Sequence, residues 1–435
     1  MKKSALFSLL LLAGGCGCLH ATGNPELEQR LKGRLIRYVT IDSQSKDNKS
    51  DEFPMTDGQH RMALALQEDI EKEIAASGAR NVSVTLSPFN YLYVTIPSNI
   101  SSDEAPVLGF SCHLDVTPEA PGGDIRPIAD VKDGRRIIRT DGTTLLGADD
   151  KCGCSILMEA MATVLADPSV PHGKLQFVFC PNEDIGRAAE KIDTALFSPD
   201  ILFDLDGAGG KEITCANFTA KGFNVLFKGH DAHPADAKAE RLGDATAAAA
   251  TFIASVPAEY RPENTEGRQG YIHPWDFSKE GTDVTVTTRV RYFDRREGEM
   301  FDSILMAAVE RCRSTFPNVE TEIIFDGLQY ENVEYSMHPA SRSLVEKCAA
   351  ENGLEIVFTD ERGGTTAAMF AARGLKGGMC IFTGQHHIHS TAEYADLGEM
   401  ADAYRLVMSL IPAVSRLSPT PSPLSSEPVA DSAAL

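Results

Sequence analysis

The residues best suited to chemistry are acids and histidines that follow apolar runs. Asp149 and Asp150 are adjacent carboxylates between an apolar run and a helical pattern at residues 155–165. Burying an aspartate is unfavourable unless it is paired or binds a metal, so the pair predicts either a polar turn that caps the helix or metal ligands. Further groups that could converge on it end other apolar runs: His113 with Asp115, Glu183 with Asp184, Asp206, and His389.

His113 and Asp115 are two residues apart at the end of an apolar run. In a strand such residues project to the same face, so the pattern indicates a metal-binding imidazole beside a carboxylate that fixes its orientation. An ordinary polar strand end is the alternative. The adjacent acids Glu183 and Asp184 would point in different directions at a turn. That arrangement suits one acid facing a metal and the other facing the water to be activated.

Two histidines and three carboxylates form a ligand set for two metal ions. If one carboxylate bridges the ions, each keeps a position for a shared water or hydroxide, as hydrolytic zinc sites require. Oxygen and imidazole ligands suit zinc, and also manganese or cobalt, and no cysteine is needed. The pattern therefore predicts a hydrolytic site with two metals.

Buried strands must position these residues. Apolar runs at residues 106–112, 175–180 and 201–207 are typical of buried strands, and each leads into acidic or histidine residues. Helical spacing at residues 25–39 and 59–76 predicts helices that pack on the sheet. Helices alternating with buried strands predict an α/β sheet of doubly wound type, in which ligands bind beyond the carboxyl ends of the strands.

The pattern changes between residues 219 and 332, where alternating strands and two helices predict a smaller inserted α+β domain. The sheet domain would comprise residues 24–218 and resume at residues 333–415. Residues 418–435 are rich in proline, serine and alanine and predict a disordered tail. The expected architecture is an α/β sheet between layers of helices, with one inserted domain.

Composition and the N-terminus bear on partners and location. The 435 residues carry 62 acidic and 41 basic side chains, a formal charge of -21, which argues against nucleic acid or an anionic membrane as a partner. Two lysines followed by an apolar run at residues 5–13 predict an export signal over residues 1–21, or a lipid anchor at Cys16. The run is too short to span a bilayer. We therefore expect an exported protein of the periplasm or cell envelope.

In order along the chain, the motifs resemble those of the di-zinc metallopeptidases of the aminoacylase and carboxypeptidase type. Within that superfamily the sequence is most similar to the tripeptide aminopeptidases, peptidase T, over about residues 27–410. The segments that carry the resemblance are residues 113–115, 145–151, 183–186, 206–207, 229–234, 292–295, 362–365 and 382–384, and His389 followed by Glu393.

The resemblance implies a role for each site residue. Two zinc ions would be bound, one by His113 and Asp206 and the other by Asp184 and His389, with Asp149 as the bridge. Glu183 would be the general base, and Asp115 would orient His113. Contacts to the carbonyl or C-terminal carboxylate of the substrate would come from His233, Arg291 and Arg362. Without the resemblance, these three would be interpreted as a surface histidine and two ion-pair residues.

The resemblance also implies an activity and an assembly. The protein would release the N-terminal residue of tripeptides, and the insertion would be a lid and dimerisation domain in a homodimer that acts on short peptides. The alternatives are a dipeptidase, a carboxypeptidase or an N-deacylase on the same scaffold, or a catalytically silent peptide-binding lipoprotein.

Three features depart from the family pattern. Asp184 stands where the family has glutamate. Thr366 stands where it has aspartate, and residues 385–387 differ as well. The third departure is the predicted export signal, because the family is typically cytoplasmic. The first departure shortens the arm of one metal ligand, and the second leaves the substrate preference open.

Overall fold

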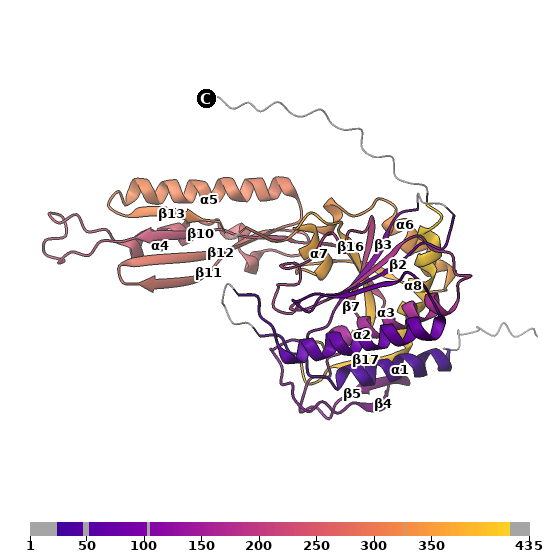
Figure 1. Ribbon diagram of the computed structural model, residues 1–435. Coiled ribbons are helices and arrows are strands. Elements are labelled where there is room, and N and C mark those ends of the chain that lie inside the picture. Colours follow the sequence, from indigo (N-terminus) through magenta and orange to yellow (C-terminus); the bar gives the residue numbers. More distant parts are fainter. Residues whose placement is uncertain (1–23, 47–51, 102–104, 326, 418–435) are drawn as a thin grey trace, which may run out of the picture.

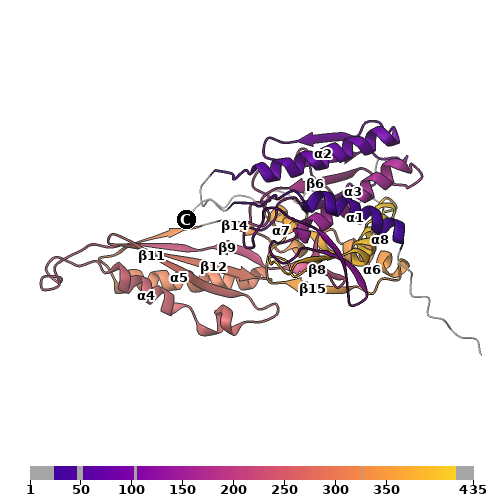
Figure 2. The same ribbon diagram turned by 90° about the horizontal axis from the view of Figure 1, so that it is seen from below.

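The computed structural model describes residues 24–46, 52–101, 105–325 and 327–417. The predicted signal at residues 1–21, the anchor candidate Cys16 and the predicted tail at residues 418–435 lie outside these ranges. Two sheets organise the described chain, one of eleven strands in the main body and one of six strands in an elongated arm (Figures 1 and 2). Within the described ranges, no helix has the length and apolar character needed to cross a membrane.

The eleven-stranded sheet has parallel strands at its centre. In spatial order these are β6 (Leu175–Cys180), β3 (Leu108–His113), β7 (Ile201–Ala208) and β16 (Gly378–His386). The sheet continues in antiparallel pairings through β2 (Leu92–Ile96) and β1 (Ser83–Leu86) on one side, and through β17 (Tyr394–Asp396), β5 (Arg135–Arg139) and β4 (Ile128–Lys132) on the other. Beside β16, β8 (Glu212–Asn217) pairs with β15 (Val357–Glu361).

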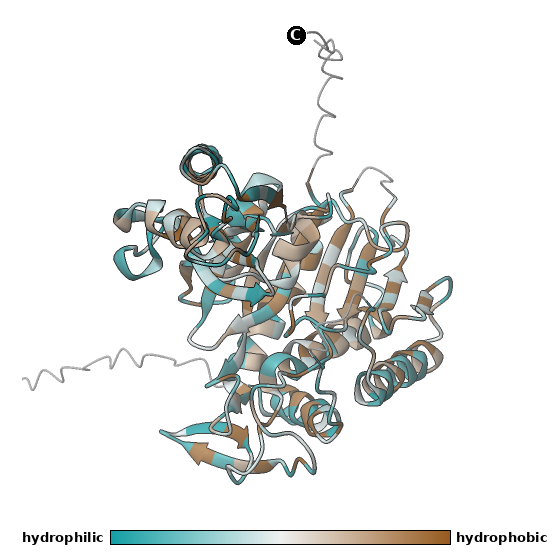
Figure 3. Ribbon diagram, turned by 90° about the vertical axis from the view of Figure 1, so that its left-hand side faces the viewer, coloured by the Kyte–Doolittle hydropathy of each residue, from teal (hydrophilic) through white to brown (hydrophobic). Residues whose placement is uncertain are grey.

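Helices cover both faces of this sheet. One face packs on α1 (Pro25–Val39), α2 (Asp57–Ser77), α3 (Ala148–Ala166), α6 (Ser341–Glu351) and α8 (Leu397–Val414), and the other on α7 (Thr366–Ala371). Successive strand residues alternate between the two layers, because Leu92 and Val94 join the first core while Tyr91 and Tyr93 join the second. The strands are accordingly hydrophobic where the layers enclose them (Figure 3). The prediction of an α/β sheet between helices is confirmed.

The arm is built from the middle of the chain. Its sheet contains β9 (Thr219–Gly222), β10 (Asn224–Lys228), β11 (Tyr271–Glu280), β12 (Asp283–Tyr292), β13 (Glu320–Ile324) and β14 (Leu328–Tyr330). Two helices, α4 (Ala245–Ser255) and α5 (Arg295–Thr315), share a separate hydrophobic core with these strands. Short 3-10 turns, η1 (Ala258–Tyr260), η2 (Pro262–Asn264) and η3 (Val333–Tyr335), complete the connections. The arm thus has its own core and projects from the main body (Figure 1).

Some elements differ from those expected. Parallel pairing is found in the four central strands and between β8 and β15, and the other pairings are antiparallel, so a simple doubly wound arrangement is not what forms. The helix expected at residues 155–165 lies within α3, which spans Ala148–Ala166. Asp149 and Asp150 have non-helical backbone angles, and the regular part starts after Asp150, whose Oδ1 accepts the N–H of Gly153 at 3.0 Å.

Candidate functional site

The ends of the central strands bring the predicted site together. Because β3 pairs in parallel with β6 and β7, its last residue, His113, lies beside Cys180, and Glu183 and Asp184 follow directly after β6. Asp206 lies near the end of β7. The sheet therefore delivers these side chains to one edge, as the carboxyl-end rule predicts.

Two groups of potential metal ligands meet at this edge and share one residue. In the first, His113 Nε2 lies 2.9 Å from Asp149 Oδ1 and 3.5 Å from Asp206 Oδ1. In the second, His389 Nε2 lies 3.0 Å from Asp184 Oδ1 and 3.3 Å from Asp149 Oδ2. Within each group the ligand atoms lie within 4.8 Å of one another. Asp149 thus offers one oxygen to each group, the arrangement required of a bridging carboxylate.

The donor atoms fit divalent metal ions. Asp184 Oδ2 is buried and has no hydrogen-bond partner among the described residues, although the other oxygen of the same carboxylate contacts His389. A buried carboxylate oxygen without a partner is unfavourable unless a cation or a donor faces it. Imidazole nitrogens and carboxylate oxygens suit zinc, manganese or cobalt. The two groups can therefore hold two ions with Asp149 between them.

Protonation in the metal-free protein reflects this crowding of acids and imidazoles. Burial raises the pKa of Asp184 to about 7 and that of Asp206 to about 6. Burial acts in the same direction on Asp149, but hydrogen bonds from His113 and His389 outweigh it and hold the Asp149 pKa well below its usual range. Hydrogen bonds to Asp149 and Asp184 raise the pKa of His389 to about 11. The imidazoles therefore carry the protons that metal ions would displace.

Asp115 contacts residues of both ligand groups without lining the cavity. Its carboxylate accepts the backbone N–H of Glu183 at 3.0 Å and that of Asp184 at 3.3 Å. The Nδ1 atom of His113 lies 3.2 Å from the backbone oxygen of Asp115 and 3.5 Å from its carboxylate. The placement of Asp115 thus matches the expected orienting residue, and it also fixes the turn that carries Glu183 and Asp184.

Asp150 has a different position from its neighbour. Its carboxylate accepts the backbone N–H of His113 at 3.1 Å and that of Gly153, and the side chain is fully buried. Gly153 is required here, because a Cβ atom on it would lie 2.0 Å from the backbone oxygen of Leu205. Asp150 therefore joins α3 to β3, while Asp149 faces the ligand groups.

A cavity of about 480 Å³ opens over the ligand groups, and Glu183 forms part of its wall together with Asp149, Asp206 and His389. Burial raises the pKa of Glu183 well above its usual value, and the nearby Asp206 and Asp184 act in the same direction. A carboxyl group beside the ligand groups can exchange a proton with a water or a substrate in the cavity. The rest of the wall is formed by Gly207, Ala208, Glu212, Thr214, Thr359, Asp360, Glu361, Gly364, Thr365, Cys380, Gln385 and Ile388.

The three residues predicted to bind substrate do not line this cavity. His233 lies on the arm with a side chain that is 74% exposed. Arg291 is buried and donates to the backbone oxygen of Val290 and to Gln329. Arg362 donates to backbone oxygens of residues 267 and 269 at 2.7 and 3.0 Å. Their assignment to the substrate remains a prediction.

Sequence reasoning assigned no role to two buried acids near the site. Asp204 accepts from Ser111 Oγ at 2.6 Å and from the N–H of Ala367, so it joins β7 to β3 and to the start of α7. In the sequence, the sign of a structural role for Asp204 is its position inside the apolar run at residues 201–207. Glu393 accepts three backbone N–H groups from the loop that carries Asp149. In the sequence, Glu393 is recognisable only as the acid that follows His389 by four residues.

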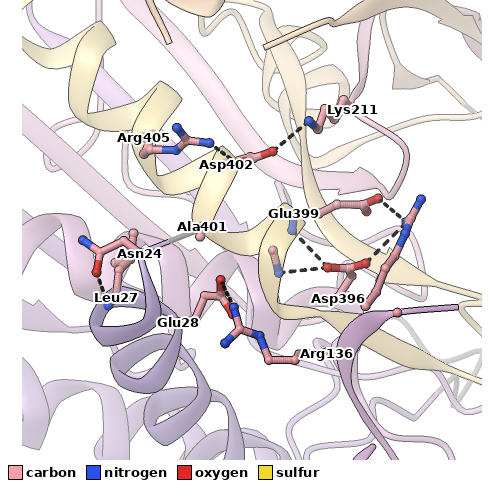
Figure 4. Close-up of a pocket in the computed structure, with 13 residues that line it drawn as sticks. Asn24, Leu27, Glu28, Arg136, Lys211, Asp396, Glu399, Ala401, Asp402 and Arg405 are labelled. Atoms are coloured by element: carbon pink, nitrogen blue, oxygen red, sulfur yellow. Dashed lines mark hydrogen bonds and ion pairs between the residues drawn. The ribbon is translucent and has the colours of Figure 1, made fainter. Parts of the chain in front are cut away.

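A second cavity, of about 470 Å³, lies between α1 and α8 and holds none of the predicted site residues. Its charges pair with one another (Figure 4): Arg136 with Glu28, Arg135 with Asp396 and Glu399, and Lys211 and Arg405 with Asp402. Glu399 also contacts His386 Nε2 at 2.8 Å. Because these acids and bases neutralise one another, the cavity over the ligand groups is the candidate active site.

Comparisons with known proteins find peptidases. Residues 109–413 match the model of Peptidase family M20/M25/M40. Peptidase T of Lysinibacillus sphaericus is 31% identical over 412 residues, which cover 88% of this chain and 98% of that protein. Peptidase T of Escherichia fergusonii is 30% identical over 411 residues, covering 88% of this chain and 98% of its own.

Solved structures share the fold. Aminopeptidase PepT from Bacillus cereus has a TM-score of 0.71 at 23% identity and covers 89% of this chain and 99% of its own. The YXEP protein of Bacillus subtilis, described as a dinuclear metal-binding peptidase of family M20, has a TM-score of 0.64 at 13% identity and covers 90% of this chain and 99% of its own.

The comparisons contradict the predicted location. Export to the periplasm or cell envelope, with a signal at residues 1–21 or a lipid anchor at Cys16, conflicts with relatives that are cytoplasmic peptidase T enzymes. The prediction rests on two lysines and a short apolar run alone. The segment concerned lies outside the described residues.

The family match, the relatives and the paired ligand groups lead to one identification. The matched region covers both ligand groups and Glu183, and relatives at about 31% identity extend over most of the chain. The chain belongs to Peptidase family M20/M25/M40 and is a metal-dependent exopeptidase of the aminopeptidase kind.

Proposed function

We propose that the enzyme releases the N-terminal residue of tripeptides and uses two zinc ions to do so. The observation that carries the proposal is the sharing of Asp149 by two ligand groups on the wall of the cavity that also contains Glu183. His113 and Asp206 would hold one ion, Asp184 and His389 the other. When bound, the ions supply Lewis acidity, which lowers the pKa of water and polarises a carbonyl group.

The residues of the chain carry the proton transfers. Glu183 accepts a proton from the attacking water and later donates it to the leaving amine. Asp115 holds the backbone of Glu183, so the base keeps a fixed position relative to the ligand groups. Residues of β8, β15 and β16 form part of the wall of the cavity in which the peptide would bind.

The arm is part of the proposal. We infer that residues 219–332 form a lid over the cavity and a dimerisation surface, and that His233, Arg291 and Arg362 contact the peptide when the lid closes. In support of a surface for a second copy, Trp275 and Phe277 on β11 are 46% and 45% exposed. Sedimentation velocity of the full chain and of a Trp275→Ser/Phe277→Ser variant would test it, and a monomeric wild-type protein would contradict it.

The activity is tested with a panel of peptides on zinc-replete enzyme. We expect release of the first residue from tripeptides with a free N-terminus, slower reaction with dipeptides and tetrapeptides, and no release from N-acetylated tripeptides. A dipeptidase would prefer dipeptides, a carboxypeptidase would release the last residue, and an N-deacylase would act on the acetylated peptide. Zinc analysis checks the metal, and fewer than two ions per active chain would contradict the two-ion site.

A further inference from the structure

Glu393 joins the two loops that carry Asp149 and His389. It is 1% exposed and lies directly before β17. Its Oε2 atom accepts the backbone N–H of Leu146 at 2.9 Å and of Gly147 at 2.6 Å, and its Oε1 atom accepts the N–H of Asp149 at 3.0 Å. One carboxylate therefore satisfies three N–H groups in the segment that holds the shared ligand.

The N–H of Asp149 lies in the first turn of α3, where a helix leaves its first donors without partners, and the N–H groups of Leu146 and Gly147 lie directly before that turn. A side chain at the N-cap usually accepts one of them, but the N-cap of α3 is Gly147, which makes no side-chain cap. Asp149 and Asp150 also have non-helical backbone angles. Glu393 supplies the missing acceptors from more than 240 residues away in the chain, so the conformation around Asp149 depends on it.

The backbone of Glu393 belongs to the segment that also carries His389. Glu393 follows His389 by four residues, and its backbone N–H donates to Ser390 at 3.3 Å. Directly after it, Tyr394 pairs with Arg139 of β5 and with His386 of β16. Glu393 is therefore held by the main sheet while its carboxylate holds the Asp149 loop. Glu393 therefore links the loop of Asp149 to the segment that carries His389.

We propose that Glu393 is a positioning residue that sets Asp149 against His389 and so determines the affinity for the ion of the Asp149, Asp184 and His389 group. The inference rests on the two-ion site of the proposed function. Asp149 also belongs to the other group, but there His113 is fixed independently by β3 and Asp115. The ion at His113 and Asp206 therefore depends less on Glu393.

A carboxylate is required for this task. A glutamine at position 393 has the same shape but only one acceptor atom, and its amide hydrogens would oppose at least one of the three backbone N–H groups. An unsatisfied N–H in a buried loop favours rearrangement of that loop. Glu393→Gln thus keeps the packing and removes the hydrogen-bond pattern.

The test is metal titration of metal-free wild type and Glu393→Gln with cobalt, followed by absorption spectra and calorimetry. Loss of a residue that supports a metal ligand weakens metal binding about ten- to a hundredfold. We expect this loss for one of the two ions, with the other within about threefold of wild type. Glu393→Asp, which keeps the charge on a shorter arm, should give an intermediate affinity.

The matched control is Glu159→Gln. Glu159 is also a buried acid, but it pairs with Arg30 and Arg34 rather than the Asp149 loop, so both cobalt affinities should stay unchanged. Equal affinities for wild type and Glu393→Gln would overturn the inference while leaving the two-ion site intact. Wild type that binds fewer than two ions would instead contradict the proposed function.

A second measurement needs no variant. Hydrogen exchange of the amides of Leu146, Gly147 and Asp149 in metal-free wild type should be slow, because Glu393 accepts these N–H groups before any ion binds. If these amides exchange freely until metal is added, the ion and not Glu393 organises the loop, and the inference fails even if the variants do not fold.

Discussion

The metal-ligand groups and the predicted substrate residues differ in how the fold positions them. His113, Asp184 and Asp206 lie at or next to the ends of strands in one sheet, and their side chains reach contact distances of each other or of Asp149. His233 and Arg291 belong to the arm, which has its own core. Strand pairing therefore fixes the ligands, whereas contacts from the arm depend on how it lies over the body.

The largest effect is expected inside the ligand region, when the adjacent acids Glu183 and Asp184 are replaced one at a time. Glu183→Gln cannot accept a proton, so kcat should fall about a hundredfold or more while two metal ions remain bound. Asp184→Asn weakens a charged ligand, so it should lose affinity for one ion, and added zinc or cobalt should restore part of the rate. Steady-state kinetics and metal analysis measure both.

Asp184→Glu serves as the control, since its longer arm is the usual family residue and should keep the metal. If Glu183→Gln loses metal while Asp184→Asn keeps two ions without turnover, the two roles are reversed. Full activity in both variants would show that this acidic pair is only a polar turn.

The same difference explains what the sequence could predict. Buried strands have long apolar runs, so β6 falls where the pattern placed it, and the acids at or after the ends of β3, β6 and β7 could be grouped by the carboxyl-end rule. The helix α1 matches its expected bounds because its apolar spacing is regular.

Other features depend on contacts that no local pattern contains. Every residue of β4 is exposed, so the β4 and β5 hairpin lacks the alternation that marks a half-buried strand. Helix α7 has only six residues, too few for a helical period. Glu393 contacts a loop far away in the chain, and its role follows only from the folded geometry.

An intermediate effect on kcat/KM is expected from replacing the arginines. It would show that residues away from the ligand groups also reach the substrate. Arg291→Ala and Arg362→Ala should raise KM for tripeptides with a free C-terminus and hardly affect amidated ones. Loss of a charge-assisted bond to a carboxylate costs about 1.5 to 3 kcal/mol, roughly ten- to a hundredfold in kcat/KM. Such a result would show that the arginines leave their present partners, Val290 and residues 267–269, when substrate binds.

Arg268→Ala is the matched control for the arginines. This side chain is 46% exposed, pairs with Glu334 and Asp360, and lies in the segment that Arg362 contacts. It should leave the preference for a free C-terminus unchanged. Equal losses on free and amidated peptides for Arg291→Ala and Arg362→Ala would remove both residues from the substrate site.

A further prediction concerns protons in the ligand region. In the metal-free protein the pKa of His389 is about 11, so the ring is protonated at neutral pH, whereas a ligating imidazole must be neutral. Metal binding must therefore release a proton, and affinity should rise about tenfold per pH unit between about pH 7 and 9. Calorimetry in buffers of different ionisation enthalpy measures the release. Affinity independent of pH would show that His389 does not bind the metal.

The smallest effect is expected from His233→Ala, on the exposed side of the arm. Its Nδ1 atom accepts only the nearby N–H of Ala235, so the free energy of unfolding should change by less than about 0.5 kcal/mol. Loss of a neutral hydrogen bond to a substrate carbonyl would cost about 0.5 to 1.5 kcal/mol, roughly two- to twelvefold in kcat/KM. Because folding is unaffected, such a loss would report contact with the peptide and hence closure of the arm. His230→Ala is the control, since the His230 ring already contacts the backbone oxygen of Glu240 at 2.9 Å. If both variants have the kcat/KM of wild type, His233 has no part in the site, and the arm contributes through its arginines or not at all.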